Sequence, residues 1–226
     1  MSTQNTSTSA NRLYGRAKGK PLSTYQAGLI DTFLPRIAID PGAPLQGLDS
    51  FKARWLEIGF GGAEHLLHRA AEDETRVIIG AEPFLNGVAK CCAGMDRGAL
   101  KNIRLHHGDV RDVMPHIPNQ SLDGIYILFP DPWPKSRHNK RRIMSAEFIG
   151  ELHRILKPGA PLYFASDIID YVDWTLTRIE AHGGFGFAPK NKADFLTPYA
   201  GWPGTRYQKK AIREGRAAHY FIFKRQ

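Results

Sequence analysis

The chain has 226 residues, of which 42% are hydrophobic and 23% charged, and its formal net charge at pH 7 is +9. This length accommodates one domain with a sizeable core, and the apolar content excludes a wholly disordered chain. No stretch reaches the length of a membrane span, and the opening residues MSTQNTSTSA lack the hydrophobic run of a signal peptide. We therefore expect a soluble, cytoplasmic protein without a membrane partner.

The N-terminal region differs in composition from the rest. Residues 1–11 are mostly small and polar, which predicts a disordered tail. Residues 12–47 are predicted to form a basic arm and a leading helix at 24–33. The first thirty residues hold no acid but four cations, Arg12, Arg16, Lys18 and Lys20. Residues 48–226 are predicted to form a single domain.

From residue 48 onward, apolar runs of strand length alternate with helix-length amphipathic segments. This alternation predicts an α/β fold with a seven-stranded, mostly parallel sheet and helices on both faces. The predicted strands are 54–58, 76–81, 103–107, 124–129, 161–165, 184–187 and 219–224. The predicted helices are 63–71, 84–99, 110–116, 145–156 and 169–182. Ligands of such sheets bind at the carboxyl ends of the strands, near the point where strand order reverses.

Cysteine and histidine do not form a metal-binding pattern. The two cysteines, Cys91 and Cys92, are neighbours within a predicted helix, so we expect buried free thiols in a reducing compartment. His65 and His68 share a helical face, but no cysteine or carboxylate accompanies them at a spacing typical of zinc sites. We predict no metal.

Residues 55–64, WLEIGFGGAE, have the pattern of a strand, a glycine turn and a helix start. Gly59 and Gly61 allow a ligand to approach the backbone closely. A dinucleotide site would have a third glycine in place of Glu64 and would hold a pyrophosphate there. Glu57 and Glu64 would repel that anion, and they favour a ligand with a cationic ammonium or sulfonium.

Two further acids follow strand ends. Glu82 lies about 20 residues past the glycines, where an acid commonly binds the ribose hydroxyls of a nucleoside. Asp109 follows the third strand and is placed to contact an adenine edge. A nucleoside without phosphate and with a cationic centre describes S-adenosylmethionine, which is the cofactor we predict.

The fourth predicted strand ends in the loop FPDPWPK, residues 129–135. Its prolines fix φ and restrict their predecessors, so the loop holds Asp131, Trp133 and Lys135 with little entropy left to lose on binding. Such a loop suits a planar, polar substrate. For Trp133, stacking on a base and wedging under the loop are equally compatible with the sequence.

Cations gather in three separated clusters: the first thirty residues, residues 135–142 and residues 206–216. Together they favour a polyanionic partner, most simply nucleic acid. For any one cluster, a solvated surface that aids solubility is a competing interpretation.

The motifs LEIGFGG, GAEP, GDV and above all FPDPWPK followed by SRHNKRR resemble the bacterial tRNA (guanine-N7)-methyltransferases, which modify a guanosine in the tRNA variable loop. The similarity covers nearly all of residues 12–226, including the arm YGRAKGK at 14–20. It implies a Rossmann-like class I methyltransferase fold, S-adenosylmethionine as cofactor and tRNA as partner. It leaves open whether the protein is a monomer or a homodimer.

The resemblance also implies roles for individual residues. The implied cofactor contacts are Glu57, Glu82, Asp109 and Asp131, beside the turn glycines Gly59 and Gly61. The implied substrate contacts are Lys135, Asp167, Thr205, Arg206, Tyr207 and Gln208. The residues expected to hold tRNA phosphates are Arg137, Lys140, Arg141, Arg142, Lys209 and Lys210. Asp167 is also placed to cap the helix that follows it.

Two positions depart from the family pattern. The family usually has glutamate where this chain has Gln208, and a glutamine accepts a hydrogen bond without adding charge. The family also has a third glycine near Ala63, where the alanine adds only a methyl group.

Guanine N7 has an in-plane lone pair, so its methylation needs no general base. The protein must align N7 with the methyl group, and Asp131, the predicted catalytic residue, would offset the developing charge or accept hydrogen bonds from the guanine N1 and N2 edge. Because side chains do not reach N7 in an RNA helix, the target is expected to be a looped-out guanine.

Two alternatives remain at this stage. An amino-methyltransferase of another target would use a loop on the same strand, but with two adjacent prolines before an aromatic residue and without Lys135. A non-catalytic RNA-binding protein of the same fold would bind tRNA without methyl transfer.

Overall fold

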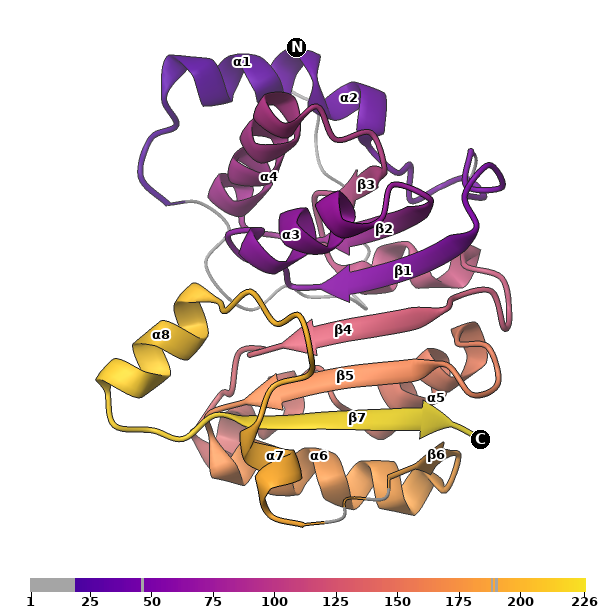
Figure 1. Cartoon of the computed structure of the whole chain (residues 1–226), viewed down its shortest axis with the longest axis vertical. Coiled ribbons are helices and arrows are strands. Elements are labelled where there is room, and N and C mark those ends of the chain that lie inside the picture. Colours follow the sequence, from indigo (N-terminus) through magenta and orange to yellow (C-terminus); the bar gives the residue numbers. More distant parts are fainter. Residues whose placement is uncertain (1–18, 46, 188, 190) are drawn as a thin grey trace.

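The computed structural model describes residues 19–45, 47–187, 189 and 191–226. The predicted tail and the first part of the arm, with Arg12, Arg16 and Lys18, lie outside the described residues. Within the described part, seven strands form one sheet in the order β3-β2-β1-β4-β5-β7-β6 (Figure 1). The strands are β1 (Ala53–Ile58), β2 (Arg76–Ala81), β3 (Ile103–His106), β4 (Gly124–Leu128), β5 (Pro161–Ser166), β6 (Phe185–Gly186) and β7 (His219–Arg225).

The sheet is mostly parallel, which confirms the predicted fold class. β1 pairs in parallel with β2 and β4, so that Leu56 lies beside Ile79 and Ile125. Only β7 runs against its neighbours β5 and β6. Strand order reverses beside β1, between β2 and β4, which is the switch point where ligands of such sheets bind.

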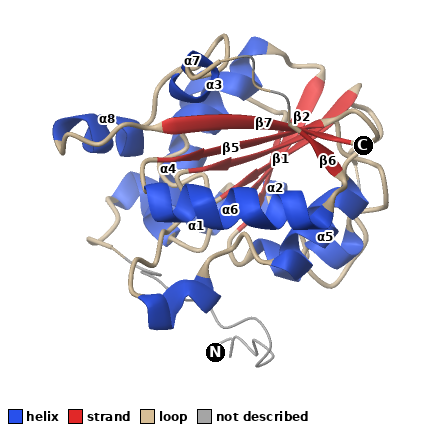
Figure 2. Ribbon diagram, turned by 90° about the horizontal axis from the view of Figure 1, so that it is seen from below, coloured by secondary structure: helices blue, strands red, loops and turns tan. Residues whose placement is uncertain are grey.

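Helices cover both faces of the sheet. The cluster of buried apolar residues on one face joins α1 (Thr24–Thr32), α3 (Glu64–Glu72) and α4 (Leu85–Gly98), together with the short α2 (Leu34–Ile37). The other face is covered by α5 (Ala146–Ile155) and α6 (Ile169–His182). Figure 2 shows α5 and α6 on the side of the sheet opposite to α3.

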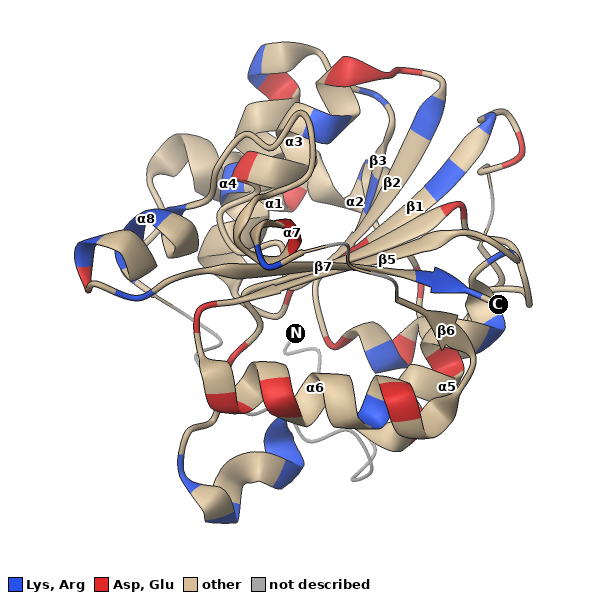
Figure 3. Cartoon of the chain, turned by 60° about the horizontal axis from the view of Figure 1, so that its bottom comes forward, with Lys and Arg blue, Asp and Glu red and all other residues tan. Residues whose placement is uncertain are grey.

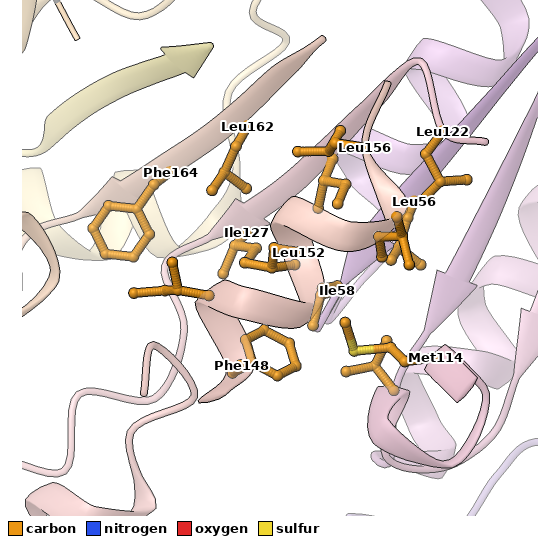
Figure 4. Packing of buried hydrophobic residues seen from close by; sticks show 14 of the residues in the cluster. Leu56, Ile58, Met114, Leu122, Ile127, Phe148, Leu152, Leu156, Leu162 and Phe164 are labelled. Carbon is orange, nitrogen blue, oxygen red and sulfur yellow. The ribbon is translucent and has the colours of Figure 1, made fainter. Parts of the chain in front are cut away.

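The larger core lies between the sheet and α5. Every residue of β4 is buried, as expected of a parallel strand covered on both faces. Figure 4 shows Leu152 and Phe148 of α5 packed toward Leu56 and Ile127 of the sheet. Cys91 and Cys92 are both free and buried in α4, as predicted.

The predicted helix at 110–116 is wrong. The segment forms two single 3-10 turns, η1 (Val110–Asp112) and η2 (Met114–His116). Pro115 explains the difference, because it has no N–H to donate and disfavours α-helical geometry at the preceding residue.

Four short helical segments were not predicted: α2 (Leu34–Ile37), η3 (Ser136–Arg141), α7 (Ala193–Leu196) and α8 (Arg206–Arg213). α8 is amphipathic, with Tyr207 and Ala211 four positions apart, but its eight residues are too few for a periodicity that is read over about 11–18 residues. It lies beside the carboxyl ends of β4 and β5 (Figure 1). Among the described residues, no helix is both long and apolar enough to cross a membrane.

Candidate active site

A cavity of about 520 Å³ opens at the carboxyl ends of the central strands. This volume lies within the range of small-molecule and cofactor sites. Its wall includes ten of the residues singled out in the sequence, namely Gly59, Gly61, Glu82, Asp109, Asp131, Trp133, Lys140, Arg141, Arg142 and Tyr207. The strand ends, the loop after β4, η3 and α8 therefore contribute to one site.

The glycine turn forms the floor of this site. Gly59 and Gly61 have φ values of 69° and 56°, which glycine adopts without steric cost. Ala63 also has a positive φ, 64°, and is fully buried. The position where the family resemblance expects a third glycine thus keeps a left-handed backbone even with an alanine.

Glu82 is fixed against this turn. Its carboxylate accepts hydrogen bonds from the backbone N–H of Gly61 at 2.7 Å and of Phe84 at 2.8 Å. Burial raises the pKa of Glu82, and the nearby charges of Asp131 and Glu57 raise it further, while the two backbone hydrogen bonds oppose the rise. The concentration of negative charge favours a cationic ligand at this end of the cavity.

Glu57 is not part of the cavity wall. Its side chain is buried behind the glycine turn, where it accepts a hydrogen bond from Nδ1 of His65 at 2.7 Å. The other ring nitrogen of His65 is hydrogen-bonded to the Tyr199 hydroxyl. In this structure the Glu57 side chain therefore supports the turn from behind. It does not line the cavity in which the cofactor contact was predicted.

Asp109 lines the cavity, and its carboxylate forms an ion pair with Arg111. Its carboxylate accepts hydrogen bonds from Nε of Arg111 at 2.9 Å and Nη2 at 2.5 Å, and from the Arg111 backbone N–H at 2.9 Å. Arg111, which also lines the cavity, was not predicted. The sequence could have indicated this contact, because an aspartate side chain commonly accepts a hydrogen bond from the backbone two residues later.

The loop that carries Asp131 has an unusual backbone. Phe129 and Trp133 have φ values of 54° and 43°, a region that bulky residues rarely adopt. Asp131 is exposed at the rim of the cavity, yet the surrounding walls desolvate its carboxyl group and raise its pKa. Backbone strain and a raised carboxyl pKa occur together at functional sites.

Trp133 is half-buried and lines the cavity. The guanidinium of Arg141 lies 4.9 Å from the centre of its ring system, and the ring of His138 meets it edge-on at 6.0 Å. Arg141 therefore already stacks with the tryptophan, in a cation–π contact.

Arg142, predicted to contact tRNA phosphates, is buried in this structure. Its side chain has no exposed surface, and it forms an ion pair with Asp170 of α6. Its Nε donates to the carbonyl oxygen of Pro132 at 2.8 Å. The neighbouring cations Lys135, Arg137 and Lys140 are exposed, and of these only Lys140 lines the cavity.

The first turn of α8 packs on the glycine turn. Arg206 forms an ion pair with Glu64, with Nε 2.8 Å from the carboxylate. The ring of Tyr207 lies so close to Gly61 that a β-carbon there would be 3.0 Å from it. Thus Tyr207 lines the cavity, while Arg206 is paired within the protein.

Gln208 and Thr205 have structural partners. The side-chain oxygen of Gln208 accepts a hydrogen bond from Nε1 of Trp202 at 2.8 Å, and the Thr205 hydroxyl accepts one from the Gln208 backbone N–H at 3.1 Å. A glutamate would accept the same bond from Trp202, so the departure at this position keeps the contact.

Asp167 lies outside the cavity wall. Its carboxylate accepts a hydrogen bond from Nε of Arg216 at 2.7 Å. The predicted helix cap is wrong, because α6 begins after Ile168 without a side-chain cap.

Lys209 and Lys210 are exposed on α8, and Figure 3 shows Lys and Arg along that helix. Among the described residues, no group of three or more His, Cys, Asp or Glu side chains is placed to hold a metal.

Comparisons with known proteins show which family the chain resembles. The family model "Putative methyltransferase" matches residues 52–221. The tRNA (guanine-N(7)-)-methyltransferase of Agrobacterium fabrum is 44% identical over the full length of both chains. The protein of the same name from Caulobacter vibrioides is 47% identical over 89% of both chains.

Solved structures show the same fold at low identity. The 16S rRNA methyltransferase KamB is 14% identical with a TM-score of 0.60, over 79% of this chain and 90% of that one. A mutant of the 16S rRNA (adenine(1408)-N(1))-methyltransferase from Catenulisporales acidiphilia, with cosubstrate SAM, is 16% identical with a TM-score of 0.56, over 83% of this chain and 91% of that one. These likenesses confirm the methyltransferase fold.

Proposed function

The chain belongs to the tRNA (guanine-N7)-methyltransferase family, and on this premise we propose that it transfers a methyl group from S-adenosylmethionine to N7 of a guanosine in the tRNA variable loop. The observation that carries the proposal is the composition of the cavity. Carboxylates come from the ends of β2, β3 and the loop after β4, while η3 contributes Lys140 and Arg141. One wall suits a cationic nucleoside and the other suits a polyanion. A tRNA substrate supports a cytoplasmic location.

The residues present fit S-adenosylmethionine. The glycine turn allows close approach to the backbone, and Glu82 and Asp109 present carboxylates to the cavity without a phosphate-binding helix start. Glu82 and Asp109 would hold the ribose and adenine, and the negative charge shared by Glu82, Asp131 and Glu57 favours the sulfonium. When bound, this cofactor supplies an electrophilic methyl group.

Asp131 lies at the rim of the cavity, on the side proposed for the substrate. Guanine N7 brings its own lone pair, so no residue needs to remove a proton. In its ionised form Asp131 accepts hydrogen bonds from the guanine N1 and N2 edge and offsets the positive charge that develops on the purine. Orientation then accounts for most of the rate enhancement.

α8 and η3 are proposed to hold the RNA. Lys209 and Lys210 of α8 and Lys135, Arg137 and Lys140 around η3 are exposed around the same end of the sheet. Contacts of this kind position phosphates without reading sequence. Tyr207, 44% exposed at the cavity wall, is placed to contact the flipped base.

The test is to incubate the protein with labelled S-adenosylmethionine and unmodified tRNA and to identify the methylated nucleoside after digestion. The expected product is 7-methylguanosine, and a tRNA carrying 7-deazaguanosine at the target position should accept no label. Methylation at another atom would favour the amino-methyltransferase alternative. Binding of both ligands without any transfer would favour the non-catalytic one.

A further inference from the structure

Arg142 connects the Asp131 loop to α6 through the interior of the protein. Its Nε donates to the carbonyl oxygen of Pro132 at 2.8 Å, and its Nη1 lies 3.4 Å from the carbonyl oxygen of Asp170. Its Nη2 forms the ion pair with the Asp170 carboxylate. One side chain thus holds a loop at the cavity and the first turn of a helix at the same time.

The surroundings of Arg142 require an arginine. Its side chain is fully buried whereas that of Asp170 is 67% exposed, so a buried cation is neutralised by a carboxylate that remains hydrated. The guanidinium lies 5.1 Å from the ring centres of both Tyr171 and Trp174. A planar group with five donors satisfies two carbonyls and a carboxylate while stacking on aromatic rings, and an ammonium group does not.

The loop needs an anchor of this kind. Pro130, Pro132 and Pro134 have no N–H groups, so the loop has few donors with which to fix its own backbone. Phe129 and Trp133 are held at positive φ, a conformation that persists only where the surroundings impose it. Arg142 binds the carbonyl of the residue that directly follows Asp131.

We propose that Arg142 is a positioning residue: by holding the Pro132 carbonyl it fixes the Asp131 carboxylate for methyl transfer, and it contacts no tRNA phosphate. The inference rests on the proposed function of Asp131. It also separates Arg142 from Lys140, which the sequence places in the same basic run but whose side chain is exposed.

The first test compares Arg142→Lys and Lys140→Gln. Because small displacements at a reacting centre are costly, Arg142→Lys should lower kcat by about 10- to 100-fold. The tRNA dissociation constant and its salt dependence should stay within twofold of the wild-type values. Lys140→Gln should instead flatten the salt dependence. Arg178→Lys is the matched control: Arg178 stacks on Trp174 and donates a hydrogen bond to the Trp174 carbonyl oxygen at 3.2 Å, and the kcat of this variant should be unchanged.

A double-mutant cycle with Asp131→Asn tests whether Arg142 acts through Asp131. If it does, Arg142→Lys should cost less than twofold in single-turnover rate once Asp131 is replaced. An equal loss in both backgrounds would overturn the proposal, as would a salt slope altered as much as by Lys140→Gln.

Hydrogen exchange gives a readout that does not depend on activity. Amides in residues 129–141 should exchange at least tenfold faster in Arg142→Lys than in Arg178→Lys, while β1 and β2 stay unchanged. Unaltered exchange in this segment would overturn the proposal. If Arg142→Lys does not fold, Asp170→Asn replaces it, with the same direction expected, because that carboxylate is exposed and its loss leaves the buried donors in place. If the wild-type protein forms no 7-methylguanosine, the proposed function fails, and the exchange experiment alone decides whether Arg142 anchors the loop.

Discussion

At the scale of single residues, Asp131 carries a charge where its surroundings disfavour one. The surrounding cavity walls desolvate its carboxyl group and raise its pKa, so the charged form is less favourable in the folded protein than in the unfolded chain. A carboxyl group with a raised folded-state pKa lowers stability at pH values above both pKa values and has no such effect below both. Function at this position therefore opposes stability.

Asp131→Asn should consequently raise the melting temperature at pH 7 while it abolishes most methyl transfer. The gain in melting temperature should shrink as the pH falls toward the ordinary aspartate pKa of 3.8. It should vanish below that pH, because Asp131 is then protonated in both the folded and the unfolded state. Scanning calorimetry between pH 3.5 and about 8 measures this difference. Asp173→Asn, at an exposed position of α6, is the control and should give no such trend. A lower melting temperature for Asp131→Asn at pH 7 would contradict the argument.

Sequence reasoning located residues at strand ends better than residues in irregular segments. Glu82, Asp109 and Asp131 follow predicted strands, and parallel strands bring their carboxyl ends together, so all three reach the cavity. The burial of Arg142 was not predicted, because a run of cations in and beside η3 gives no sign of which side chain turns inward. The hydrogen bond of Glu57 with His65 was not predicted either, because the sequence of β1 does not show which partner its carboxylate meets.

At the scale of elements, the site depends on how closely α4 approaches the glycine turn. A β-carbon at Gly87, near the start of α4, would overlap the carbonyl oxygen of Gly61 and lie 3.3 Å from Cγ of Glu82. Because the obstacle is backbone, the helix or the turn must shift. The element itself was predicted by periodicity, whereas this contact depends on a packing distance that periodicity does not encode.

Gly87→Ala should therefore destabilise the protein by about 1–3 kcal/mol, as overpacking commonly does, and weaken S-adenosylmethionine binding at least tenfold. Gly28→Ala is its matched control, since Gly28 lies in α1 with nothing within 4 Å of the added carbon. That change should stabilise the protein by about 0.5–1 kcal/mol through helix propensity. Urea unfolding and calorimetric titration with the cofactor measure both quantities. Equal effects of the two substitutions would show that the approach of α4 to the turn is unimportant.

At the scale of the whole molecule, basic residues from separate parts of the chain gather around one end of the sheet. η3 follows β4, and α8 lies beside the carboxyl ends of β4 and β5 (Figure 1). The clusters were recognisable in the sequence as charge runs, but their common location was not, since α8 has only eight residues and is too short to be recognised by its periodicity. Lys52 directly precedes β1 and Lys101 lies two residues before β3, and both are exposed at the opposite, amino end of the strands.

This distribution predicts how tRNA binding depends on salt. The pairs Lys135→Gln with Lys140→Gln, and Lys209→Gln with Lys210→Gln, should each reduce the slope of log affinity against log salt by about 1.4–1.8, the value for two lost phosphate contacts. Lys52→Gln with Lys101→Gln removes the same charge from the opposite end and should leave the slope within about 0.3 of the wild-type value. Filter binding of unmodified tRNA across a salt series measures all three. If the control pair changes the slope as much as the other two, affinity arises from net charge and not from phosphate contacts at the active-site end. If only the Lys209 and Lys210 pair changes the slope, the lysines of α8 hold the RNA phosphates and those around η3 do not.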